Sequence, residues 1–387
     1  MILRTEEIGD GSISYLKNGD PIFRLSSHPE NPVVKPDELG LTWYEGGKLR
    51  VGAVFNGGAE IFRDKIILTP RCHKGYRKKE FFDEKLGIKR TCLENYISEV
   101  WVLQSEDGVS FSPPGTVIKG DGSDHTDFVH GIEDIRIVRF RERYILIGCG
   151  KIKPPFKGEN ADRVAIYSTE DFDTIRYHGI IRHFDSRNAV LFPDLISDKV
   201  YMLLRFHPNI HITSLEAGLD QLLEPESYSR SWKKVYENRE ENILLKAGEL
   251  PHEREKIGPG TPPIRTEKGW LIIYHGVGAI KREICEIYGL SEKIERGYSV
   301  CAALLDLDDP GKVLARTHHP IYIPSLPWEL YGDDRYPVDV PAVVFPMGAI
   351  IHRGKLLIYA GAGDKYVILL TCDLKMLLDY LMDRRIY

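Results

Sequence analysis

The stretch HGIEDIRIVRFRERYILIGCG, residues 130–150, contains two strand-like runs joined by a short charged turn. The runs cover residues 135–140 and 144–149, and the adjacent carboxylates Glu133 and Asp134 precede the first of them. Apolar runs of this length around a tight polar turn are typical of two paired β-strands. Two acids at the mouth of a strand pair indicate a candidate site.

The same pattern recurs at other places along the chain. Each copy has a short apolar or proline-bearing run, a polar turn and an aromatic or aliphatic strand, and the spacing leaves room for two further strands per interval. The other copies are VFNGGAEIFRDKIILTPR (54–71), NAVLFPDLISDKVYMLLRF (188–206), GPGTPPIRTEKGWLIIYHG (258–276) and VVFPMGAIIHRGKLLIYAG (343–361). Radial repetition of four-stranded sheets is a β-propeller, so we predict an all-β fold, a five-bladed β-propeller.

The rest of the chain fits one domain over residues 1–387. Residues 1–48 are predicted to form a strap of loops that closes onto the first blade. Residues 72–96 are strongly charged and are interpreted as an insertion in that blade, and residues 211–257 form a second irregular region without clear periodicity. Residues 373–385 place leucines at helical spacing behind an aspartate, which predicts a C-terminal amphipathic helix covering a blade edge.

Composition argues against several classes of partner. The formal charge of −5 gives no electrostatic reason to bind nucleic acid or an anionic membrane. The six cysteines lack C-x-x-C spacing, which is typical of reduced, buried thiols. The first residues show no secretory leader, and no apolar run is long enough to span a membrane. We therefore expect a cytoplasmic protein.

Alignment of the copies predicts which polar residues meet around the propeller axis. These residues are Asn56, Asp134, Arg187 and Thr261 at the starts of copies, and Arg71, Arg205, His275 and Asp364 at the ends of the second strands. Glycoside hydrolysis ordinarily needs two carboxyl groups. When inorganic phosphate is the nucleophile it arrives as an anion, so the second carboxyl is unnecessary and guanidinium groups are needed instead. A set with one acid, several cations and an imidazole suits that chemistry.

Several motifs also resemble one known family. GIEDIRI, residues 131–137, is similar to the GIEDPRI signature of glycoside hydrolase family 130, which contains the mannoside phosphorylases and related mannosidases. The resemblance continues in the same order through AVLFP, GPGTPPI, GWLIIYHGV, ALLDLDDP and VVFPMG, nearly the whole chain. In this sequence Ile135 replaces the usual proline, and Asn188 stands where an aspartate is common.

The resemblance implies inverting cleavage of a β-mannosidic bond by phosphate, which gives α-mannose 1-phosphate and a free sugar. It implies that Asp134 is the general acid. It assigns phosphate binding to Arg187, Arg205 and His275, and substrate binding to Asn56, Arg71 and Asp364. Glu133 is expected to orient Asp134 within the substrate site.

Other readings of the same residues stay open. The carboxylates and arginines could simply pair with each other, and His275 could be a core histidine. The function could be an inverting β-mannoside hydrolase or a noncatalytic carbohydrate-binding propeller. No metal or cofactor is expected apart from phosphate as co-substrate, because pairs such as His318 and His319 lack metal-ligand spacing. The expected partners are a β-mannoside oligosaccharide and phosphate, while the acceptor sugar and a homo-oligomeric state are left open.

Overall fold

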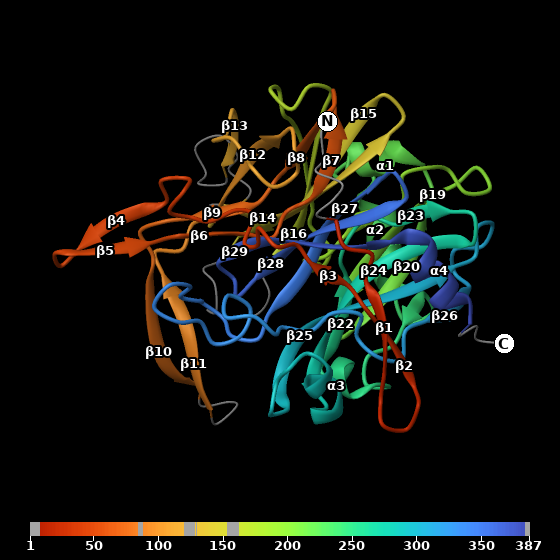
Figure 1. The fold of residues 1–387 in the computed structure, drawn as a ribbon. Coiled ribbons are helices and arrows are strands. Elements are labelled where there is room, and N and C mark those ends of the chain that lie inside the picture. Colours follow the sequence, from red (N-terminus) through yellow and green to blue (C-terminus); the bar gives the residue numbers. More distant parts are fainter. Residues whose placement is uncertain (1–7, 84–87, 120–127, 129, 153–161, 384–387) are drawn as a thin grey trace.

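The computed structural model describes residues 8–83, 88–119, 128, 130–152 and 162–383. Five antiparallel sheets form the blades of a β-propeller, as the sequence repeats predicted (Figure 1). Blade 1 contains β6 (Ala53–Phe55), β7 (Ala59–Phe62), β8 (Lys65–Leu68), β9 (Arg71–His73), β12 (Glu99–Ser105) and β13 (Thr116–Lys119). Blade 2 contains β14 (Ile132–Phe140), β15 (Arg143–Lys151), β16 (Asp162–Thr169) and β17 (Arg176–Ile181).

The remaining blades follow in chain order. Blade 3 contains β18 (Val190–Leu191), β19 (Val200–Phe206), β20 (Asn209–Leu215) and β21 (Ile243–Leu245). Blade 4 contains β22 (Lys256–Pro259), β23 (Ile264–Thr266), β24 (Gly269–Ile280), β25 (Ile294–Leu305) and β26 (Val313–Arg316). Blade 5 contains β27 (Val344–His352), β28 (Lys355–Ala362), β29 (Tyr366–Asp373) and β3 (Ser26–Ser27).

The hydrophobic core lies between the blades and closes the ring. One cluster of buried side chains joins each neighbouring pair of blades, and a further cluster joins blade 5 back to blade 1. Because each sheet packs another sheet on both of its faces, central strands such as β15 and β29 are almost continuously buried. This explains why the copies read as uninterrupted apolar runs rather than as an alternation of polar and apolar residues.

The N-terminal segment corrects one expectation. Residues 1–48 were predicted to be loops closing onto the first blade, but β3 pairs with β29 and completes the fifth blade. The Asn31 side chain extends this pairing: its Nδ2 donates to the Leu369 carbonyl at 2.8 Å, and its Oδ1 accepts from the Leu369 N–H at 2.7 Å. The segment also contains two hairpins, β1 (Ser12–Tyr15) with β2 (Pro21–Arg24) and β4 (Thr42–Glu45) with β5 (Lys48–Val51). The ring is therefore closed by strands from opposite ends of the chain.

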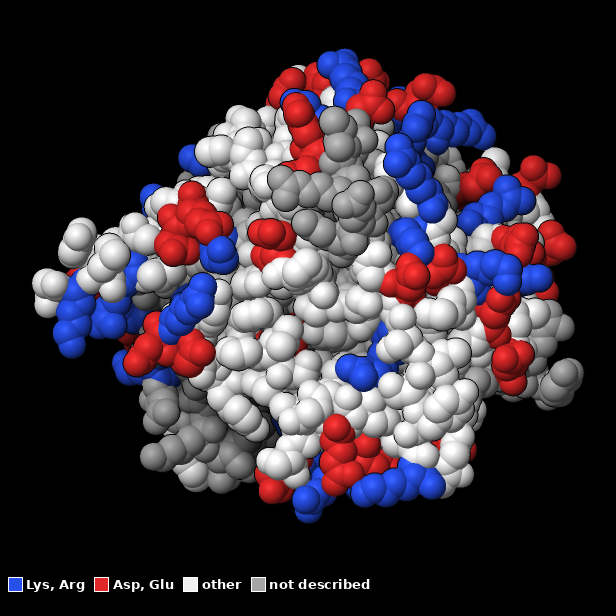
Figure 2. All heavy atoms as spheres, viewed as in Figure 1, with Lys and Arg blue, Asp and Glu red and all other residues white. Residues whose placement is uncertain are grey.

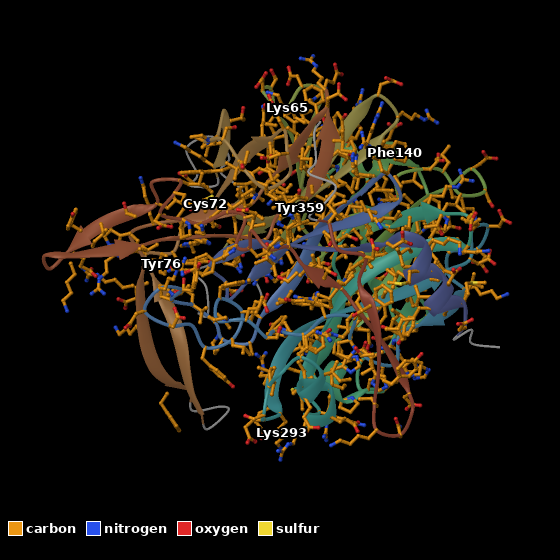
Figure 3. All side chains as sticks on the ribbon, in the orientation of Figure 1. Lys65, Cys72, Tyr76, Phe140, Lys293 and Tyr359 are labelled. Carbon is orange, nitrogen blue, oxygen red and sulfur yellow. The ribbon has the colours of Figure 1, made fainter. Side chains whose placement is uncertain are left out.

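The two irregular segments are additions to the blades. Residues 72–96 leave blade 1 as the hairpin of β10 (Arg77–Asp83) and β11 (Ile88–Glu94), which projects from the body beside β4 and β5 (Figure 1). Figure 3 shows Tyr76 where this hairpin departs. Residues 211–257 contain α1 (Leu219–Leu223), α2 (Ser229–Glu237) and the 3₁₀ turn Pro251–Glu253. Another short helix, α3 (Arg282–Ile287), follows β24.

The predicted C-terminal helix is confirmed as α4 (Leu374–Met382), with residues 384–385 outside the described part of the chain. Asp373 caps it by accepting a hydrogen bond from the Met376 N–H at 2.9 Å. Its apolar face packs against β29 and the outer strand β26. The helix therefore covers a blade edge that would otherwise expose unpaired backbone groups.

The surface and the thiols agree with the composition. Acidic and basic side chains are interspersed over the face seen in Figure 2. Within the described residues, no helix combines the length and apolar character that crossing a membrane requires. The cysteines whose side chains are described are buried and unpaired: Cys72, Cys149, Cys285, Cys301 and Cys372.

Replacement of Asn31 by alanine should weaken ring closure. The variant leaves the buried Leu369 N–H without the acceptor that it now has, so we expect a loss of about 1–3 kcal/mol in the free energy of unfolding. Urea denaturation measures this loss. The control is Asn18→Ala in the exposed turn between β1 and β2, which should change stability by less than about 0.5 kcal/mol. Equal stability of the two variants would contradict the role of Asn31.

Candidate active site

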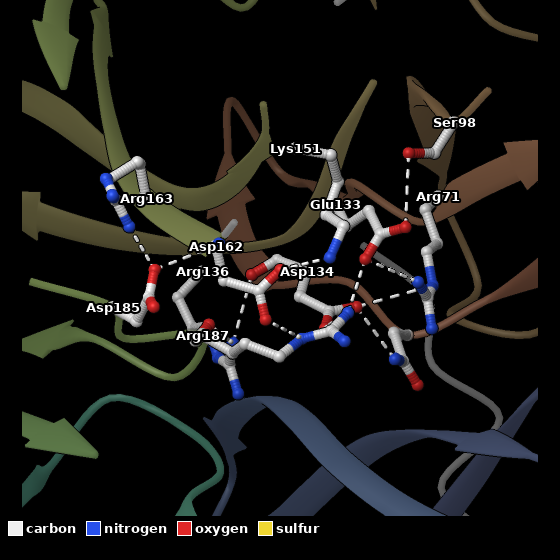
Figure 4. Close-up of polar contacts among 11 residues, drawn as sticks. Arg71, Ser98, Glu133, Asp134, Arg136, Lys151, Asp162, Arg163, Asp185 and Arg187 are labelled. Atoms are coloured by element: carbon white, nitrogen blue, oxygen red, sulfur yellow. Dashed lines mark hydrogen bonds and ion pairs between the residues drawn. The ribbon is translucent and has the colours of Figure 1, made fainter. Parts of the chain in front are cut away.

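Polar residues from blades 1, 2 and 3 meet near the propeller axis. Glu133 and Asp134 on β14 lie between Arg71 of β9 and Arg187, which precedes β18 (Figure 4). Asn56 follows β6 and reaches the same group of side chains. These residues are separated by up to 131 positions in the chain, and the ring brings them together as the alignment of the copies predicted.

Asp134 occupies a β-bulge. The pairing of β14 with β15 shifts between Glu133 and Arg136, and Asp134 has a left-handed backbone with φ of 54°. Gly148 lies on the strand opposite, where a Cβ would come within 2.7 Å of the Ile135 side chain. A bulge re-aims the side chain that it carries, and left-handed conformations in non-glycine residues cluster at functional sites. The bulge is the local reason that Asp134 departs from the alternation of its strand.

The two carboxylates share cations from both sides. Arg71 Nη1 lies 2.8 Å from Glu133 Oε2, and Arg71 Nε lies 3.4 Å from Asp134 Oδ1. Arg187 Nη2 pairs with Glu133 Oε2 and lies 3.6 Å from Asp134 Oδ2. Asn56 donates to Asp134 Oδ1 at 2.8 Å. Because Glu133 and Asp134 are only 1% and 3% exposed, these contacts are what makes their burial as anions possible.

The charges set the ionisation of the acid. Burial by itself raises the pKa of Asp134, but the guanidinium groups of Arg71 and Arg187 outweigh burial and lower its pKa well below the ordinary value. Burial lowers the pKa of Arg187, and nearby carboxylates reverse that effect and raise it well above its usual range. In the protein without substrates, Asp134 is therefore a carboxylate.

Arg205 and His275 form a second group beside the first. Both side chains lie against Gly258, where a Cβ would come within 2.6 Å of the His275 ring and 3.0 Å of Arg205 Cδ. His275 is fully buried, and its ring packs against Phe345 at 4.3 Å between centroids. Among the described residues, neither ring nitrogen has a hydrogen-bond partner. Within the described residues, the Arg205 guanidinium has no carboxylate in ion-pair distance. Neither residue touches the two carboxylates directly.

Burial and neighbouring cations act in one direction on this second group. The pKa of His275 lies well below its ordinary value because of burial first and then the positive charge of Arg205 and Lys256. Burial and the charge of Arg187 also lower the pKa of Arg205. His275 is thus a neutral imidazole, and Arg205 is a cation in an unfavourable position. An anion bound between them would relieve that repulsion.

A cavity of about 130 Å³ opens beside the carboxylates. Asp364, in the turn between β28 and β29, lines it together with Arg71 and Arg187. Burial raises the pKa of Asp364 to about 6; the Arg71 charge opposes this rise, and Asp134 and Asp339 add to it. The backbone of Asp364 is left-handed, as are those of Asn56 and Asp134.

Several residues of the site were not predicted. Asp162 at the start of β16 pairs with Lys151 and lies 3.7 Å from Arg187 Nε. Tyr96 and Leu93, from the insertion at residues 72–96, line the cavity. The insertion was interpreted only as a solvated surface. Most of its residues are charged or polar, so the sequence did not single out Leu93 and Tyr96 as residues of the cavity.

Lys256 belongs with His275, and Asn188 follows Arg187 in the chain. Lys256 begins β22 and lies 5.2 Å from the centre of the Tyr298 ring, which stacks on His275. Asn188 is 1% exposed, and its Oδ1 has no hydrogen-bond partner in the part of the chain that the structure describes. Lys256 begins a strand, but only the folded ring shows that its charge acts on His275.

A cluster of metal-ligating residue types lies elsewhere in blade 4. His252, Glu253 and Cys301 offer three ligand atoms within 4.8 Å of one another. Arg316 already pairs with Glu253, and Tyr274 donates to the same carboxylate at 2.7 Å. Glu253 is therefore already paired with a guanidinium and hydrogen-bonded by a tyrosine, so these residues fit an ion-pair network better than a metal site.

The fold and the axial group together define a five-bladed propeller with a buried carboxylate and guanidinium site. The chain belongs to glycoside hydrolase family 130, whose model, described as beta-1,4-mannooligosaccharide phosphorylase, matches residues 25–383. This confirms the resemblance seen in the motifs.

Individual relatives agree with that membership. The chain is 29% identical over 356 residues to a beta-1,2-mannobiose phosphorylase of Thermoanaerobacter sp. (strain X514), covering 89% of this chain and 96% of that protein. It is 28% identical over 393 residues to a beta-1,2-mannobiose phosphorylase of Listeria innocua serovar 6a, covering 92% and 97%. The solved complex of the Listeria innocua beta-1,2-mannobiose phosphorylase with beta-1,2-mannobiose has a TM-score of 0.66 at 23% identity, covering 93% and 99%.

The raised pKa of Asp364 predicts a pH-dependent stability. The pKa rises from an ordinary 3.8 to about 6, so the folded protein holds the proton more tightly than the unfolded chain. The resulting stability is fully present below about pH 4 and is lost as the pH rises through about 6. Asp364→Asn should therefore resemble the wild type at pH 4 and exceed it at pH 7 by up to about 3 kcal/mol in the free energy of unfolding.

Chemical denaturation at the two pH values measures this difference. Asp198→Asn, in the exposed turn before β19, is the control and should leave the pH profile unchanged. A variant at Asp364 that is less stable than the wild type at pH 7 would contradict the sign.

Proposed function

We propose that the protein is an inverting phosphorylase that cleaves a β-mannosidic bond with inorganic phosphate and releases α-mannose 1-phosphate and a free sugar. The family membership and the named phosphorylases among its relatives support the reaction class. The observation that carries the proposal is Arg205, a cation without a carboxylate partner in the described residues, held beside a buried imidazole with unpaired nitrogens.

The phosphate site is formed by Arg205, His275 and Arg187. Arg205 and the fully charged Arg187 supply guanidinium groups, which match the oxygens of a phosphate in geometry and charge. The neutral His275 offers one N–H donor to the same anion. Lys256 and the amide of Asn188 complete the site from β22 and from the residue after Arg187. Arg187, Arg205 and Lys256 offer donors only, which suits a dianion.

The sugar site lies on the other side of Arg187. Arg71 of blade 1 and Asp364 of blade 5 line the cavity, and Asn56 of blade 1 donates to Asp134. These side chains supply donors and acceptors for sugar hydroxyls. Phosphate oxygen attacks the mannosyl C1 as the bond from C1 to the glycosidic oxygen breaks. Asp134 gives its proton to the departing oxygen, directly or through a sugar hydroxyl. Attack from the face opposite the leaving group inverts the β-linkage to the α-phosphate.

The depressed pKa of Asp134 constrains the order of events. A carboxylate cannot donate a proton, so the acid must be protonated when both substrates are present. Phosphate bound at Arg187 and Arg205 offsets the positive charge that now stabilises the Asp134 anion. A sugar in the cavity also removes water. Both changes raise the pKa of Asp134, so substrate binding itself prepares the acid.

A hydrolytic function is the second candidate. One solved structure has a TM-score of 0.63 at 17% identity to this chain. Its description says that the GH130 family of mannoside phosphorylases contains glycoside hydrolases that target beta-1,2 mannosidic linkages. A hydrolase needs a carboxylate to activate water. In this chain the basic residues Arg187, Arg205 and His275 stand at the three predicted phosphate positions, which favours the phosphorylase.

Phosphate dependence tests the proposal. The protein is incubated with β-1,2-mannobiose or β-1,4-mannobiose, with and without inorganic phosphate, and α-mannose 1-phosphate is followed by ³¹P nuclear magnetic resonance. We expect turnover only with phosphate and only the α-anomer. Release of free mannose at the same rate without phosphate would instead establish a hydrolase. The two disaccharides distinguish the 1,4-linkage in the family description from the 1,2-linkage of the named relatives.

Asp134→Asn separates an enzyme from a binding protein. Loss of the acid should reduce kcat by about 10²–10⁴-fold while disaccharide binding, measured by calorimetry, is retained. A wild-type protein that binds the disaccharide without turnover under any phosphate concentration would be a noncatalytic propeller.

Arg205→Met tests the phosphate site. Removal of one charge-assisted contact should raise the KM for phosphate by about 10–100-fold, since such hydrogen bonds contribute about 1.5–3 kcal/mol. In buffer without phosphate the variant should be at least as stable as the wild type, because the Arg205 cation is disfavoured there. Arg176→Met, at an exposed position of β17, is the control. A phosphate KM equal to that of the control would remove Arg205 from the site.

A further inference from the structure

Arg136 is a completely buried arginine whose partners are main-chain carbonyls. Its guanidinium donates to Asp134 O at 3.1 Å and Arg187 O at 3.4 Å through Nη1. It donates to Pro259 O at 3.1 Å through Nη2 and to Gly260 O at 3.0 Å through Nε. No carboxylate lies within ion-pair distance of it in the described residues. A buried cation is costly, and this one is stabilised by oriented carbonyl dipoles rather than by a salt bridge.

The accepting carbonyls belong to three different blades. Asp134 is the acid on the bulge of β14, and Arg187 is the residue before β18 that pairs with both carboxylates. Pro259 ends β22, where Gly258 pairs in register with His275 of β24. One side chain therefore holds the main chain at the acid, at one phosphate arginine and beside the imidazole (Figure 4 shows Arg136 beside Asp134 and Arg187).

The rigid fork of the guanidinium is what makes this possible. Three nitrogens point in fixed directions within one plane, so the carbonyls that they bind must keep a fixed relative arrangement. A lysine ammonium at the same place would carry the charge but would not fix three separate main-chain segments. The Phe345 ring lies 5.9 Å from Arg136 Cζ, and Gly58 lies against the Arg136 main chain, where a Cβ would come within 3.0 Å of Arg136 Cα.

We propose that Arg136 is a positioning residue: by binding the carbonyls of Asp134, Arg187, Pro259 and Gly260, it fixes the distance between the acid and the phosphate site. The inference rests on the proposed phosphorylase function. It assigns Arg136 no contact with either substrate. The sugar-binding residues Asn56, Arg71 and Asp364 lie on blades 1 and 5, whose main chains Arg136 does not hydrogen-bond.

This arrangement makes a specific kinetic prediction. Arg136→Lys keeps the charge and loses the fork, so the acid and the phosphate site lose their fixed separation. We expect kcat for phosphorolysis to fall by about 100-fold, the effect of a misplacement of about 1 Å. The KM for phosphate should rise by about 10-fold, while the KM for the disaccharide stays within about 2-fold.

Arg136→Met separates position from charge. It removes the fork and the cation together, so it should share the loss in kcat. It should also shift the pH profile of kcat to higher pH, because Arg136 is one of the cations that lower the pKa of Asp134. Arg136→Lys should keep the wild-type profile. A loss of kcat shared by both variants, with a pH profile that moves only in Arg136→Met, separates the positioning role from the effect of the charge.

Arg316→Lys is the matched control. Arg316 is a buried arginine of blade 4 whose partners are side chains, namely Tyr274, Glu249 and Glu253. Its replacement should lower thermal stability and leave kcat and both KM values within about 2-fold of the wild type. Folding of every variant is checked by circular dichroism and thermal unfolding before kinetics.

The outcomes distinguish the two levels of the argument. A wild-type protein without phosphate-dependent turnover overturns the proposed function and, with it, the role of Arg136. An active wild type with an equally active Arg136→Lys variant overturns the positioning role alone. A variant in which both KM values rise equally, or a failure of both Arg136 variants to fold, would show that Arg136 serves the fold and not the site.

Discussion

The burial of two adjacent carboxylates at the propeller axis is the constraint on which the site depends. Glu133 and Asp134 are 1% and 3% exposed, and an ionised carboxyl so far from water is stable only when cations and hydrogen-bond donors surround it. No single blade supplies enough of them, since Arg71 comes from blade 1 and Arg187 from the start of blade 3. The closed ring is therefore a condition for the charge cluster as well as for the hydrophobic core.

The same constraint gives Arg187 two competing uses. Without substrates it pairs with Glu133, Asp134 and, more distantly, Asp162, and these contacts neutralise the acid cluster. In the proposed reaction Arg187 also binds phosphate. The bound anion offsets the charge of Arg187 and so weakens its stabilisation of the Asp134 carboxylate. Because Glu133 and Asp162 keep neutralising contacts with Arg71 and Lys151, the cluster tolerates this exchange. Asp134 keeps only a longer cation contact, 3.4 Å to Arg71, so in the proposed reaction it is the group whose ionisation changes.

Much of this arrangement could be predicted from the chain. Five copies of one apolar pattern predicted the blades, and the alignment of their ends predicted that Asn56, Arg71, Asp134 and Arg187 would meet. The closing strand β3 was missed because a two-residue strand, Ser26–Ser27, has no periodicity to read and its partner lies more than 340 positions away. Asp162 was missed because it starts a third strand, which the comparison of copies did not cover, and Lys151 was missed because that copy was taken to end at residue 150, one position earlier.

The positions that could not be read from polar residues are marked instead by glycines in strands. Gly148 leaves room for the bulge that turns Asp134 inward, and Gly258 allows Arg205 and His275 to approach each other. Gly361 leaves room for the Asn56 side chain, since a Cβ there would lie 2.0 Å from Asn56 Oδ1. Asn56 in turn donates a hydrogen bond to Asp134. Glycine weakens a strand, so it persists where a side chain would fill space that the site needs. In this propeller the glycines lower the stability of their strands, and the space that they leave allows charged groups from separate blades to come into contact.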